Sequence, residues 1–157
     1  MVSVYKILPV IILAVVSFAC VSEEESIYTS NMITYDLVPA SEYDYQGVAI
    51  VREIRDGGVE LELLLEGEKS AEPYFYPAHL HRGSYDSDHT PMAQMLSPVD
   101  ARTLISSTII TQLADGSKMD FNRFLEFDGH IKVHLAEDGP DYDVILVVGN
   151  VGANSQK

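Results

Sequence analysis

Short runs in which apolar and polar residues alternate recur along most of this chain. The clearest run follows the turn signal Asp56-Gly57-Gly58, where residues 59–65 alternate aliphatic and acidic side chains. A period of two places successive side chains on opposite faces of a β-strand. We therefore expect an all-β fold, an antiparallel Greek-key-like β-sandwich of about eight strands. The expected strands are residues 32–38, 47–54, 59–65, 74–81, 92–99, 103–113, 129–136 and 142–148.

One segment has helical rather than strand-like spacing. Asp120 is a suitable N-cap, and Phe121, Phe124 and Leu125 follow at the spacing of one helix face. The pair Asp128-Gly129 then favours an end to the helix. We expect one short helix at about residues 120–127.

Two of the expected strands carry histidines on one face. In Tyr76-Pro77-Ala78-His79-Leu80-His81 the two imidazoles are two residues apart, and Pro77 favours an edge position or a β-bulge. In Gly129-His130-Ile131-Lys132-Val133-His134-Leu135 the pattern repeats, with His130, Lys132 and His134 on one face. Both segments are expected to turn aliphatic side chains inward and histidines outward.

Composition limits the class of protein. The 157 residues suffice for one domain with a core, and their 46% apolar content favours a packed fold over disorder. The formal net charge is −14 and the sequence has no basic cluster, so the surface would repel phosphates. This argues against nucleic-acid binding. Cys20 is the one cysteine, so a monomer has no disulfide.

The first residues are typical of a lipoprotein signal peptide. Lys6 precedes an apolar run over residues 7–18, which is too short to span a bilayer as a helix. The run ends at Ala19-Cys20, which resembles a bacterial lipoprotein cleavage box and predicts lipidation of Cys20. The alternative is an ordinary signal peptide followed by an incidental cysteine.

The residues after Cys20 are polar and acidic. Glu23-Glu24-Glu25 resembles the acidic export signal of surface-exposed lipoproteins in Bacteroidota-type bacteria. We expect an outer-membrane lipoprotein held by its lipid, exposed at the cell surface or else facing the periplasm. The expected organisation is a signal peptide at 1–19, an acidic tether at 20–31, a β-domain at 32–154 and a tail at 155–157.

A series of short motifs resembles CHRD domains, the module first named in chordin, and in particular CHRD-domain lipoproteins. The resemblance spans about residues 32–154 and implies a β-sandwich whose biochemical role is largely unassigned. The motifs are Pro77-Ala78-His79-Leu80-His81, Leu96-Ser97-Pro98-Val99-Asp100, Leu113-Ala114-Asp115-Gly116-Ser117, Phe127-Asp128-Gly129-His130-Ile131-Lys132-Val133-His134-Leu135 and Gly149-Asn150-Val151-Gly152-Ala153-Asn154.

CHRD domains are in turn similar to the copper–zinc superoxide dismutase sandwich, in which a His-x-His strand and a later histidine bind copper. By that resemblance the ligands here are His79, His81 and His134. The chain departs from the enzyme in lacking paired cysteines, and Lys132 beside His134 would repel a cation. The candidates for a zinc loop are Asp86, Asp88 and His89.

Two functions follow from these observations. The first is a non-enzymatic binding or structural module of the cell envelope, with an unknown protein or extracellular ligand, in which the histidines only brace the fold. The alternative is a copper- or zinc-binding envelope protein, because three imidazoles can hold either ion with a fourth position open. The crowded acids Asp138, Asp141 and Asp143 suggest a weaker calcium alternative.

Overall fold

The computed structural model describes residues 26–88 and 90–156. The expected signal peptide, Cys20 and the acidic run at 23–25 lie outside these residues, as does His89. Among the residues that the structure describes, no helix is both long enough and apolar enough to cross a membrane.

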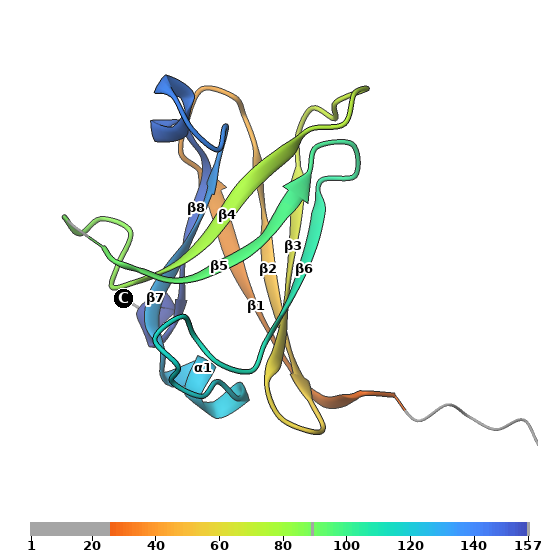
Figure 1. The fold of residues 1–157 in the computed structure, drawn as a ribbon, viewed down its shortest axis with the longest axis vertical. Helices are drawn as coiled ribbons and strands as arrows, with labels where there is room; N and C mark the ends of the chain where they lie inside the picture. Colours follow the sequence, from red (N-terminus) through yellow and green to blue (C-terminus); the bar gives the residue numbers. More distant parts are fainter. Residues whose placement is uncertain (1–25, 89, 157) are drawn as a thin grey trace, which may run out of the picture.

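The described chain forms eight antiparallel strands and one short helix (Figure 1). This confirms the prediction of an all-β antiparallel fold. β1 begins at Tyr28, so residues 28–31, expected as tether, belong to the first strand. The strands are β1 (Tyr28–Pro39), β2 (Gln46–Ile54), β3 (Val59–Glu66), β4 (Phe75–Arg82), β5 (Met92–Asp100), β6 (Ile105–Ile110), β7 (Asp128–His134) and β8 (Ile145–Gly152).

The expected helix is α1 (Phe121–Glu126), and its N-cap is Asp120, whose carboxylate accepts from the backbone N–H of Arg123. Two single-turn 3₁₀ helices were not predicted. The first, η1 (Pro140–Asp143), lies where the sequence favours an acidic turn, and the second, η2 (Ala153–Gln156), follows β8.

The strands close into a barrel in the order β1-β2-β3-β6-β5-β4-β7-β8, so the expected sandwich is wrong in this respect. At two places, called seams here, neighbouring strands of the barrel are joined by very few residue pairs. β1 pairs with β8 only at Val38 and Pro39, and β5 pairs with β6 only at Asp100. Between these seams lie two four-stranded layers, β6-β3-β2-β1 and β5-β4-β7-β8 (Figure 1). The molecule is therefore a flattened barrel whose two layers resemble the expected sandwich.

The connections after β3 and β6 cross between the layers and produce Greek-key order, since β6, β5 and β4 lie between β3 and β7. These crossings put β4 and β7 side by side although three other elements separate them in sequence. β4 is a central strand, so the edge position suggested by Pro77 is wrong. The alternative of a bulge is correct, because the register with β5 shifts between Tyr76 and Ala78.

Alternation explains which side chains fill the barrel. On β3, Val59, Leu61 and Leu63 are fully buried, while the intervening Glu60 and Glu62 lie outside and both pair with Arg52 on β2. On β4 and β7 four inward aliphatic residues again belong to the same core. They are Ala78, Leu80, Ile131 and Val133. This arrangement leaves the histidines on the outward face of the β5-β4-β7-β8 layer.

Candidate metal centre

The register between β4 and β7 brings the two histidine-bearing faces together. His79 lies opposite Lys132 and His81 lies opposite His130, so all four side chains share one face of the sheet. His134 continues that face at the end of β7. Potential ligand atoms of His79, His81 and His134 all lie within 4.8 Å of one another. The structure thus places together the three residues that the sequence singles out.

The histidines point outward from the barrel core, as expected, but other segments largely cover them. His79 is 8% exposed, His134 is 5% exposed and His130 is fully buried. On one side the loop after β4 supplies carbonyl groups that bond to the rings of His81 and His130. On the other side the ring of Tyr142, in η1, stacks on His134 with centroids 4.5 Å apart. Side chains that point outward from the barrel therefore form a second, polar interior.

Backbone carbonyls fix the tautomers of two of the three histidines. His81 Nδ1 donates to the Thr90 carbonyl at 3.0 Å, and His134 Nδ1 donates to the Tyr142 carbonyl at 2.7 Å. Since a carbonyl can only accept, each ring carries its proton on Nδ1 and keeps a lone pair on Nε2. Such a bond to the far nitrogen orients a metal-ligating histidine and raises its basicity.

Three ring nitrogens of the trio are buried and have no hydrogen-bond partner. They are His81 Nε2, His134 Nε2 and His79 Nδ1. An unpartnered buried polar atom costs about 1–3 kcal/mol, so three of them in one place call for a physical explanation. This set of nitrogens fits the ligand set of a copper or zinc ion in both donor type and number.

The electrostatic environment keeps these rings neutral. Burial, aided by His134 and His81, lowers the pKa of His79 to about 4. Burial also lowers the pKa of His81 and of His134, against the opposing effect of the carbonyls that bond to them. Neutral imidazole is the form that binds metal, so at pH 7 no proton has to be displaced from the trio.

His130 and Lys132 share the face without joining the trio. The His130 ring stacks on His81 with centroids 5.1 Å apart, and its Nδ1 donates to the Gly83 carbonyl. It braces the loop after β4, which is the role that the first of the two functions gives to the histidines. Lys132 contributes a positive charge that lowers the pKa of His81 and of His134.

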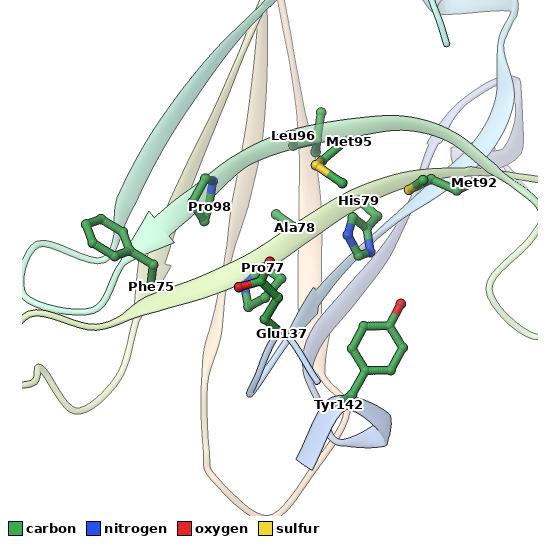
Figure 2. Close-up of a pocket in the computed structure, with 10 residues that line it drawn as sticks. All are labelled: Phe75, Pro77, Ala78, His79, Met92, Met95, Leu96, Pro98, Glu137 and Tyr142. Atoms are coloured by element: carbon green, nitrogen blue, oxygen red, sulfur yellow. The ribbon is translucent and has the colours of Figure 1, made fainter. Parts of the chain in front are cut away.

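A pocket opens beside His79, and sequence reasoning missed most of its lining (Figure 2). Its volume is about 450 Å³ and its walls are mainly apolar. Met92 and Met95 come from β5 and Tyr142 from η1. Their position depends on strand pairing and on a turn that closes over the sheet, and no residue pattern in the sequence reports either.

The remaining candidates do not form clusters. Among the described residues, the trio is the one group of three or more histidine, cysteine or acidic side chains whose ligand atoms converge. Asp138, Asp141 and Asp143 therefore give no converging calcium site, and Asp86 and Asp88 are exposed on the loop after β4.

Comparisons of the chain with models of protein families, with curated proteins and with solved structures each gave no match.

Proposed function

We propose that this protein binds one copper or zinc ion through His79, His81 and His134. The observation that carries the proposal is the convergence of their potential ligand atoms within 4.8 Å, in a place where three ring nitrogens are buried without partners. Of the two functions considered from the sequence, this favours the metal-binding alternative.

A purely bracing role does not account for the trio. It explains the Nδ1 atoms of His81, His130 and His134, because those atoms bond to carbonyls of covering segments. His130 Nε2 is also buried without a partner, but His130 is not in the converging group. A bracing role does not explain His79, whose Nδ1 is buried and unpaired. Nor does it explain why one potential ligand atom from each of the three histidines lies within 4.8 Å of the other two. A shared cation satisfies all three lone pairs at once.

The donor set suits either metal, since imidazole is a good ligand for both copper and zinc. Bound copper would supply one-electron chemistry and bound zinc a Lewis acid. The residues themselves supply three neutral imidazoles, two of them oriented by carbonyls, beside a mainly apolar pocket. We propose binding rather than catalysis as their role.

The cellular setting remains a proposal from the sequence. We propose a CHRD-like lipoprotein anchored in the outer membrane through lipid on Cys20, with the acidic run at 23–25 directing it to the cell surface. In cells fed a labelled fatty acid, the label should enter the intact protein and be lost in Cys20→Ser. Equal labelling of both proteins would contradict the anchor.

The metal proposal is tested by titrating the purified metal-free chain with Zn(II) and with Cu(II), followed by elemental analysis. We expect about one equivalent of either ion at neutral pH, and a loss of about 100-fold or more in affinity for His79→Ala/His81→Ala. Circular dichroism on the same samples shows whether the variant retains its strands. Substoichiometric metal that is unchanged in the folded double variant would overturn the proposal.

A further inference from the structure

We infer that the site also accepts monovalent copper, with the thioether sulfurs of Met92 and Met95 as ligands beside the histidines. This inference rests on the proposed metal centre and concerns which ion it prefers. It makes the protein a candidate for holding reduced copper rather than only divalent ions.

Strand pairing puts each methionine next to a histidine of the trio. In the register of β5 against β4, Met95 lies opposite His79 and Met92 lies opposite His81. Side chains directly opposite one another in an antiparallel pair share a face, with Cβ atoms about 4.5–5.5 Å apart. Both methionines also line the pocket that contains His79. In Figure 2 they lie on either side of His79 along the neighbouring strand.

The two methionines are not packing residues. Met92 is 48% exposed and Met95 is 62% exposed, whereas Ala93 and Leu96 of the same strand are buried in the core. The register of β5 with β4 shifts at Leu80/His81, and this irregularity puts two outward methionines three positions apart. Their side chains are therefore solvent-accessible where they line the pocket.

Ligand chemistry favours a soft ion of low charge. Thioether sulfur is a soft, neutral donor that selects Cu(I) over harder divalent ions. Lys132 lies opposite His79 on the same face, and its repulsion of a monovalent ion is half its repulsion of a divalent ion at the same distance. The combination of imidazole, thioether and a neighbouring cationic side chain thus points to Cu(I).

The test is an anaerobic titration of the full-length chain with Cu(I), using bathocuproine disulfonate as the competing chelator. Met92→Leu/Met95→Leu removes both sulfurs at exposed positions while nearly conserving volume. Met32→Leu is the matched control, because Met32 is 60% exposed on β1 in the other layer. The same proteins are titrated with Zn(II), and their Cu(I) forms are measured by X-ray absorption.

We expect the double variant to lose about tenfold or more in Cu(I) affinity and to lose the sulfur shell from its absorption spectrum. Its Zn(II) affinity should stay within about twofold of the unaltered chain, and Met32→Leu should match that chain in every measurement. An unchanged Cu(I) affinity, or an equal loss of Zn(II) affinity, would overturn the role of the methionines.

The two proposals fail in different ways. If the unaltered chain binds Zn(II) but its Cu(I) complex shows no sulfur ligand, the histidine centre stands and the methionine inference is wrong. That outcome would leave the exposed methionines as an apolar contact surface. If the unaltered chain binds neither ion, both proposals are wrong.

Discussion

Adding Zn(II) to the metal-free protein should raise its free energy of unfolding by about 4 kcal/mol when the free ion is at 1,000 times its dissociation constant. The reason is that the proposed ligands come from two strands that are adjacent only in the folded barrel. His79 and His81 lie on β4 and His134 on β7, with β5, β6 and α1 between them in sequence. The unfolded chain cannot present the three nitrogens together, so binding energy becomes folding energy.

To isolate the site, variants are compared by how much Zn(II) raises their free energy of unfolding, and not by the free energy of unfolding itself. This rise is called the increment below. In His134→Gln the increment should fall to nearly zero. In His130→Gln it should remain, although that variant loses the bond to the Gly83 carbonyl and is less stable without metal. Urea unfolding with and without metal measures both quantities. An equal increment in the two variants would show that Zn(II) stabilises the protein from another position.

Acidification should destabilise the metal-free protein between about pH 6.5 and pH 4. The pKa of His79 is about 4 in the folded state because of burial and the neighbouring His134 and His81, against an ordinary value of about 6.5 in the unfolded chain. Below pH 6.5 the unfolded chain takes up a proton that the folded protein does not. The stability is therefore complete above about pH 6.5 and declines as the pH falls towards 4.

His79 alone should account for about 2–3 kcal/mol of this loss. Burial lowers the pKa of His81, His130 and His134 too, so these residues add to the loss in the same direction. The negative charge of Asp86 raises the pKa of His130, and that of Asp143 raises the pKa of His134, against the effect of burial. The positive charge of Lys132 lowers both pKa values further.

Urea unfolding at pH 7 and pH 4.5, in the presence of a chelator, measures the effect. His79→Gln should show a smaller difference between the two conditions, because it removes the titrating group. The exposed pair Asp100–Arg102 does not confuse the result, since hydrogen bonds from Arg102 lower the pKa of Asp100 to about 2, below this window. A protein equally stable at both pH values would contradict the buried, neutral state of the trio.

The strands could be predicted because each one follows from the pattern of residues within its own segment. Alternation over residues 59–65 identifies β3 and its inward face, and Asp120 with Phe121 and Phe124 identifies α1. Closure of the barrel could not be predicted, because it depends on a few pairs between distant segments. Val38 and Pro39 against Val148 and Val147 form the whole ladder at one seam.

The candidate site, too, was predictable only in the part that depends on local sequence. The spacing of His79 and His81, and the resemblance to the copper–zinc superoxide dismutase sandwich, pointed to the three histidines. Their convergence required β4 and β7 to be neighbours, and their burial required Tyr142 and the loop after β4 to cover them. The methionines were missed because a shift of register on β5, invisible in the sequence, sets them beside the histidines.

Anomalous diffraction from crystals of the full-length chain grown with Zn(II), recorded on both sides of the zinc edge, tests the metal centre most directly. The account predicts one strong peak about 2.0–2.1 Å from each of His79 Nδ1, His81 Nε2 and His134 Nε2. A peak elsewhere, or no peak at the trio at saturating zinc, would contradict it.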